Sequence, residues 1–135
     1  MRDALAAPYL EGLRREELLV QRCSACGRSQ LPPRYQCAEC GSDRMTWVSA
    51  SGRAKVVSFT VLHRAPAPEF ESRIPYVYAV VELEEGPRIV TNLVHQAPEE
   101  ATIGQPVAVV FERMDEEDHA WPEFAPASAG LRPPA

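Results

Sequence analysis

The chain has 135 residues, 45% of them hydrophobic and 24% charged, so its size and composition suit one globular domain or a small module joined to a larger one. Its formal net charge of −5 disfavours sequence-independent binding to nucleic acid, which requires a basic face. The apolar runs are far shorter than the roughly 20 residues that cross a bilayer, and the start lacks the pattern of a secretory signal. We therefore expect a cytoplasmic protein with no membrane contact.

The first segment, residues 1–17, is predicted to contain a short helix. Leu10 and Leu13 are three residues apart among charged residues, which places both on one face of a helix. Gly12 lies between them and weakens the helical tendency. The next residues, 18–22, are predicted to form a short strand that leads directly into the first cysteine.

The strongest motif consists of two Cys-x-x-Cys pairs separated by ten residues, formed by Cys23, Cys26, Cys37 and Cys40. A two-residue gap lets both thiolates of a pair face one metal ion. Gly27 and Gly41 follow the two pairs directly and allow the crowded backbone to turn away. Residues 23–41 contain few large aliphatic side chains, so a hydrophobic core cannot hold this segment together. The pattern predicts a tetrahedral four-sulfur site with a structural Zn²⁺ ion.

Three other interpretations of the cysteines were weighed against zinc. An even number of cysteines allows disulfides, although these suit exported proteins. A thioredoxin-like redox pair needs one Cys-x-x-Cys at the start of a helix in a βαβ unit. Paired Cys-x-x-Cys-Gly motifs also hold the single iron of rubredoxins, but about two thirds of this chain follows the motif, whereas an electron carrier is little more than its metal site. The length of the remaining chain favours zinc.

Residues 46–114 are predicted to form a small β-barrel. Runs rich in β-branched and aromatic residues alternate there with turn-forming residues. The expected strands are 46–49, 55–62, 76–83, 89–94 and 107–112. Residues 84–87, Glu-Glu-Gly-Pro, indicate a tight turn and therefore a hairpin. Because no long helical period separates the strands, a barrel is favoured over a parallel sheet.

Two segments differ from tight turns. Residues 64–75 form a long, proline-rich connection with Phe70 and Arg73, so they are either a candidate binding loop or a surface loop held down by Phe70. Residues 115–135 are first acidic and then rich in alanine and proline. We expect this tail to be extended or disordered unless Trp121 and Phe124 dock on another part of the protein.

Catalytic motifs are lacking in the sequence. The three histidines, His63, His95 and His119, are far apart, and the cysteines are assigned to a metal. No Gly-x-Gly-x-x-Gly or Walker-type phosphate loop occurs. We therefore expect a chain that is not an enzyme on its own.

Short motifs follow one another in a specific order from residue 8 to about residue 126. They are Tyr-Leu-Glu-Gly-Leu at 9–13, Leu-Leu-Val-Gln-Arg-Cys at 18–23, Pro-Pro-Arg at 32–34, Cys-Ala-Glu-Cys-Gly at 37–41, Ser-Gly-Arg-Ala-Lys-Val at 51–56, Thr-Asn-Leu at 91–93, Ile-Gly-Gln-Pro-Val at 103–107 and Trp-Pro-Glu-Phe at 121–124. This order resembles the DUF35 family, whose members are described as acyl-CoA-associated or thiolase accessory proteins. The resemblance implies a mainly β fold with an N-terminal helical segment (1–17), a rubredoxin-like zinc ribbon (18–45), an OB-fold barrel (46–114) and an extended or disordered tail (115–135).

The resemblance also implies a non-catalytic accessory subunit. DUF35 proteins are partners of thiolase-like or lipid-transfer-type enzymes, and some are fused to or bound to MaoC-like hydratases. The expected assembly is an aldolase, thiolase or hydratase complex of lipid metabolism, with two copies of each subunit. In it the partner carries the chemistry, and this chain helps to form an acyl-CoA site. The residues suggested for contact with acyl-CoA or with the partner are Arg34, Tyr35, Phe70 and Arg73.

Two alternatives belong to other functional classes. OB barrels often bind single-stranded nucleic acid by stacking bases on aromatic side chains, and Phe59, Tyr76 and Tyr78 are available for stacking. The acidic charge of the chain opposes this function. The other alternative is a free-standing acyl-CoA-binding protein, which would act without a partner enzyme.

Overall fold

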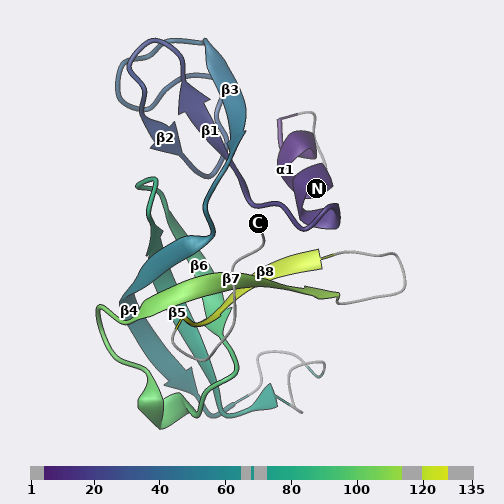
Figure 1. Ribbon diagram of the computed structural model, residues 1–135, viewed down its shortest axis with the longest axis vertical. Helices are drawn as coiled ribbons and strands as arrows, with labels where there is room; N and C mark the ends of the chain where they lie inside the picture. Colours follow the sequence, from purple (N-terminus) through teal and green to yellow (C-terminus); the bar gives the residue numbers. More distant parts are fainter. Residues whose placement is uncertain (1–4, 65–67, 69–72, 114–119, 128–135) are drawn as a thin grey trace.

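The structure is a computed structural model that describes residues 5–64, 68, 73–113 and 120–127. These residues form a short α-helix, a small three-stranded sheet and a closed five-stranded barrel, in that order along the chain (Figure 1). Strand is therefore the main secondary structure, which confirms the predicted fold class. Within the described ranges, no helix combines the length and the apolar composition that crossing a bilayer requires.

The helix α1 (Ala7–Arg14) packs against the first strand, β1 (Leu19–Cys23). Leu13 is buried, and Leu10 lies partly buried against the same core, as their spacing predicted. Gly12 lies at the contact, because a Cβ atom at this position would stand only 2.8 Å from Cγ of Leu19. The residue that weakens the helix in isolation is therefore the one that allows its close approach to the strand.

The small sheet is antiparallel, with β1 in the centre between β2 (Ser29–Gln30) and β3 (Met45–Ser49). Side chains alternate between the two faces of a strand, so Gln21 and Cys23 of β1 share one face. Both are buried. The cysteine pairs lie in the two loops that this sheet supports, one between β1 and β2 and one between β2 and β3.

The barrel consists of β4 (Arg53–Leu62), β5 (Tyr76–Leu83), β6 (Arg88–Leu93), β7 (Pro106–Arg113) and β8 (Ala120–Pro126), with a short 3₁₀ helix, η2 (Pro98–Glu100), before β7. The strands close in the order β4-β5-β6-β8-β7, and only β6 and β8 pair in parallel. Alternating apolar side chains fill the interior. The most buried of them are Val56, Val77, Val81, Leu83, Val107, Val109 and Phe124.

Two strands belong to other parts of the fold than the sequence predicted. Residues 46–49 were expected in the barrel, but β3 pairs along its full length with β1 and belongs to the small sheet. Residues 120–126 were assigned to the tail, but they form β8, which closes the barrel between β6 and β7. Of the two residues whose docking was expected to order the tail, Trp121 and Phe124, Phe124 is fully buried. Most of the pairing of β8 is antiparallel with β7, but Pro122, Glu123 and Pro126 are residue types that are depleted in strands, so the composition of this segment did not indicate one.

The linker between the small sheet and the barrel is only three residues long, 50–52, and each residue is hydrogen-bonded. The Ala50 N–H donates to the Leu18 carbonyl (2.8 Å), and the Ser51 N–H donates to Glu85 Oε2 (2.7 Å). The carbonyl of Gly52 accepts the N–H of Val109 (2.8 Å). The linker is thus fixed to both parts of the protein.

Candidate metal centre and contact surfaces

The four cysteines converge as predicted on one cluster, with all four Sγ atoms within 4.8 Å of one another. The Sγ atoms of Cys23 and Cys40 are 3.6 Å apart, as are those of Cys26 and Cys37. Four sulfurs around Zn²⁺ at about 2.3 Å form a tetrahedron with edges of about 3.8 Å, so the cluster fits such an ion. No disulfide joins the cysteines, because all four are free. The donor set is therefore that of a tetrahedral thiolate site.

Two loops of matching geometry build the cluster. In the first, the Gly27 N–H donates to the Cys23 carbonyl (2.8 Å), and in the second the Gly41 N–H donates to the Cys37 carbonyl (2.9 Å). Both glycines have positive φ angles, 82° and 78°, a conformation that other residues adopt at a cost. The glycines that follow each pair are therefore required by the turn itself.

Backbone N–H groups favour the thiolate form of two ligands. The Cys26 N–H donates to Cys23 Sγ (3.4 Å) and lowers the pKa of Cys23 to about 6. The N–H groups of Cys40 (3.5 Å) and Glu39 (3.4 Å) donate to Cys37 Sγ and lower the pKa of Cys37. Hydrogen bonds to a charged sulfur stabilise it, so each loop favours the thiolate form of one of its two cysteines.

A pair of glutamines holds the loop formed by residues 31–36, here called the Tyr35 loop. Gln21 is 2% exposed; its Oε1 accepts the Arg34 N–H (2.8 Å), and its Nε2 donates to the Arg34 carbonyl (3.0 Å). Gln30 Nε2 donates to Gln21 Oε1 (3.0 Å) and to the Gln36 carbonyl (3.3 Å). Gln30 Oε1 accepts the Ala38 N–H (3.0 Å), which ties the glutamines to the second cysteine pair.

The Tyr35 loop places two of the suggested contact residues side by side on the surface. Tyr35 is 73% exposed, more than any other large hydrophobic residue that the structure describes. Together with Arg34, Tyr35 borders a hollow of about 470 Å³ that reaches Cys37 and Leu5. Both residues were predicted from the sequence to make contacts, whereas Gln21 and Gln30 were not. Their signal is weak: Gln21 is a polar residue in an apolar strand, two positions before Cys23.

The other two suggested residues lie elsewhere. Phe70 falls outside the described residues. Arg73 is near the end of the 64–75 connection, and its Nη2 donates to Glu123 Oε2 at 2.7 Å. The Glu123 carboxylate is buried in β8 and also accepts Asn92 Nδ2 (3.2 Å). Arg73 therefore ties the connection to the last barrel strand, and the structure does not bring it together with Arg34 or Tyr35 in a described pocket.

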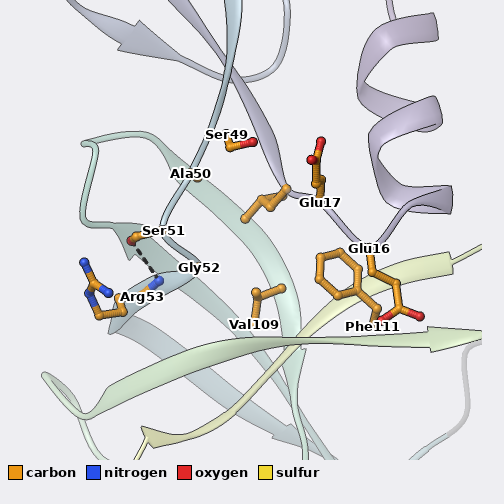
Figure 2. Close-up of a pocket in the computed structure, with 10 residues that line it drawn as sticks. Glu16, Glu17, Ser49, Ala50, Ser51, Gly52, Arg53, Val109 and Phe111 are labelled. Carbon is orange, nitrogen blue, oxygen red and sulfur yellow. Dashed lines mark hydrogen bonds between the residues drawn. The ribbon is translucent and has the colours of Figure 1, made fainter. Parts of the chain in front are cut away.

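A second hollow, of about 330 Å³, lies where the turn after α1, the linker and β7 meet (Figure 2). Phe111 and Val109 border it on the β7 side, and Glu17 lies opposite them. Arg53, at its edge, donates to both carboxylate oxygens of Glu84 (2.8 and 2.7 Å), and Ser51 Oγ accepts the Arg53 N–H (3.1 Å). The described lining contains neither a cysteine nor a histidine. Its serines therefore have no histidine beside them to act as a general base.

A third hollow, of about 300 Å³, lies between α1, the Tyr35 loop and β6. Its lining is mostly apolar and consists of Tyr9, Leu31, Pro32, Pro33, Arg88, Ile89 and Val90. Burial raises the pKa of the Tyr9 phenol at its edge. The described part of the chain thus offers a cluster of four cysteines and several surface hollows.

Comparisons with known proteins match both parts of this architecture. The family model described as "ChsH2, rubredoxin-like zinc ribbon domain" matches residues 10–46, and "ChsH2, C-terminal OB-fold domain" matches residues 47–112. A "DUF35 domain-containing scaffold protein" of Methanocaldococcus jannaschii is 40% identical over 101 residues, which cover 74% of this chain and 71% of that protein. These matches agree with the ribbon and the barrel seen in the structure.

Two further matches concern larger assemblies. A "Probable enoyl-CoA hydratase alpha subunit" of Thermomonospora curvata is 43% identical over 119 residues, which cover 88% of this chain but only 36% of that protein. A chain in the solved structure called "Ltp2-ChsH2(DUF35) aldolase" is 40% identical, with a TM-score of 0.84 over 93% of this chain and 97% of that one. By its two domain matches and by its identity to the DUF35 scaffold protein and to the aldolase chain, this chain belongs to the DUF35 family and combines a ChsH2-type zinc ribbon with an OB-fold domain.

Proposed function

We propose that the chain is a non-catalytic accessory subunit that binds a thiolase-fold enzyme and helps to form or stabilise the acyl-CoA site of that enzyme. The observation that carries this proposal is the likeness, over nearly both full lengths, to a chain of the Ltp2-ChsH2(DUF35) aldolase. A relative named as a probable enoyl-CoA hydratase alpha subunit supports a hydratase as the other partner class, for which we propose a MaoC-like enzyme. None of the three hollows is lined by a histidine among the described residues, which suits a subunit whose partner performs the reaction.

We further propose that the four-cysteine cluster contains a structural Zn²⁺ ion. When bound, the metal supplies cross-links between the two cysteine loops in a segment whose own core is small. The four thiolates are all used as ligands, so no ligand position is left for catalysis. Elemental analysis of the purified protein tests the metal: one zinc per chain and no visible absorption is expected, whereas a red protein with one iron would overturn the zinc assignment.

Co-purification tests the accessory function. The chain would be tagged and purified gently from its own host, and its companions identified by mass spectrometry, with a nuclease-treated sample as control. A thiolase-fold or hydratase-fold protein in near-equal amount is the expected result. Recovery of the chain alone would contradict the proposal and favour a free-standing acyl-CoA-binding protein, which direct titration of the isolated chain with acyl-CoA would then examine.

A nucleic-acid-binding function is the second candidate, and one observation favours it. Tyr78 lies exposed on β5, opposite Asn92 of β6, on the barrel face that OB folds commonly use for oligonucleotides. The net charge of −5 opposes it, because single-strand binding depends on a positively charged groove. Companions that disappear on nuclease treatment in the same co-purification would support this candidate over the accessory subunit.

A further inference from the structure

The Tyr35 loop combines exposure with a fixed backbone, which is unusual for a surface loop. Arg34 and Gln36, the two neighbours of Tyr35, are both held through their backbones, Arg34 by the buried Gln21 and Gln36 by the partly buried Gln30. Pro32 and Pro33 precede them and restrict the chain further. Tyr35 itself remains 73% exposed. Because the backbone that carries its ring is already fixed, binding of a partner would cost little additional backbone entropy.

The side chains on the loop also suit a protein partner. Tyrosine and arginine are enriched at the energetic centres of protein interfaces, where an aromatic ring enters a pocket and a guanidinium pairs with a carboxylate. Arg34 has no ion-pair partner among the residues that the structure describes, whereas Arg28 and Arg53 pair with Glu39 and Glu84. A carboxylate from another protein would complete the environment of Arg34.

We propose that the Tyr35 loop is a pre-organised docking site for a protein partner, with Tyr35 as its anchor and Gln21 as the residue that positions it. The partner surface has an apolar socket for the phenol ring and an Asp or Glu at its rim for Arg34. Gln21 is buried and reaches the loop through the backbone of Arg34 and through the Gln30 side chain, so it is a positioning residue. This docking site would place the contact with the partner enzyme on the ribbon. Only the identity of the partner rests on the proposed function.

Site-specific photo-crosslinking in the host tests the proposal with the full chain. Tyr35 is replaced by the photoreactive aromatic amino acid p-benzoylphenylalanine, and the matched control carries it in place of Ile103, which is 65% exposed on a barrel turn. We expect a crosslink from position 35, and none from position 103, to a peptide with apolar side chains and an acidic residue. Adding Arg34→Gln or Gln21→Met to the position-35 chain should reduce the crosslinked yield several-fold.

A second measurement separates positioning from general damage to the fold. Hydrogen exchange of the isolated chain should show that Gln21→Met exposes the Arg34 amide, while metal content and the protection of the barrel strands stay unchanged. If Gln21→Met instead leaves both the Arg34 amide and the crosslink unaffected, the positioning role is wrong. If it releases the metal, the glutamine supports the ribbon as a whole and the specific role is also wrong.

The outcomes distinguish the docking site from the proposed function. A crosslink from position 35 to a thiolase-fold or hydratase-fold protein, weakened by Arg34→Gln, supports both. The same crosslink to a protein of another class supports the docking site and contradicts the proposed function. No crosslink from position 35, equal crosslinks from both positions, or a crosslink to coenzyme A or nucleic acid overturns the docking site, even if co-purification recovers the expected enzyme.

Discussion

The ion pair between Arg73 and Glu123 should make a large contribution to the stability of the barrel. The Glu123 side chain is 5% exposed and that of Arg73 is 25% exposed, with 2.7 Å between Arg73 Nη2 and Glu123 Oε2. Breaking a fully buried pair costs about 3–5 kcal/mol, because one charge is left without a partner in a poorly solvated place. Here Asn92 still donates to Glu123, and Arg73 is partly solvated, so Arg73→Met should lower the free energy of unfolding by about 2–3 kcal/mol.

Equilibrium unfolding in urea, followed by circular dichroism with the metal bound, measures this effect. A loss of that size shifts the midpoint by roughly 1–2 M at the usual dependence on denaturant for a protein of this size. The double variant Arg73→Met/Glu123→Leu removes both charges and should recover much of the lost stability. Arg53→Met is the matched control, since the Arg53–Glu84 pair is more than half exposed on both sides and should matter little. Equal effects of Arg73→Met and Arg53→Met, or no recovery in the double variant, would refute the reasoning.

Three further predictions concern the metal, the last strand and the helix. Removing the metal with a strong chelator should abolish hydrogen-exchange protection in residues 18–45 and leave β4 to β8 protected; simultaneous loss in both would contradict a purely local role. Phe124→Ala should destabilise the protein by about 3–5 kcal/mol in thermal or urea unfolding, because Phe124 is fully buried where β8 closes the barrel, and a loss below about 1 kcal/mol would argue against that strand. Gly12→Ala should destabilise by about 1–3 kcal/mol although it raises helix propensity, because the new Cβ meets Leu19; a more stable variant in the same unfolding assay would show that the contact relaxes.

Local patterns were sufficient for the elements that depend on local chemistry. The cysteine spacing predicted a cluster that the structure brings together, and the run of β-branched and aromatic residues at 76–83 predicted the bounds of β5. The turn at 84–87 joins β5 and β6, and its Gly86 has the positive φ of 117° that favours glycine. In each case the residues that indicate the element lie close together in the sequence, so their local geometry can be predicted from their spacing.

Features that depend on distant residues were not predictable in this way. The composition of 120–126, with two prolines and a glutamate, does not indicate a strand, and its place in the barrel depends partly on Leu93 of β6, thirty-one residues before Phe124. Glu123 looks like a solvated acid until Arg73 approaches from a segment fifty residues away. Gln21 is similarly ordinary in sequence, and its role appears only when the Tyr35 loop folds over β1.

The three-residue linker has a mechanical consequence for any complex that this protein joins. Because its backbone is hydrogen-bonded to Leu18 on one side and to Glu85 and Val109 on the other, the ribbon and the barrel should move as one rigid body. The distance and angle between the Tyr35 loop and the outer face of β5 and β6 are then fixed. If an enzyme bound at both places, this protein would fix the spacing between the bound enzyme surfaces in the assembly.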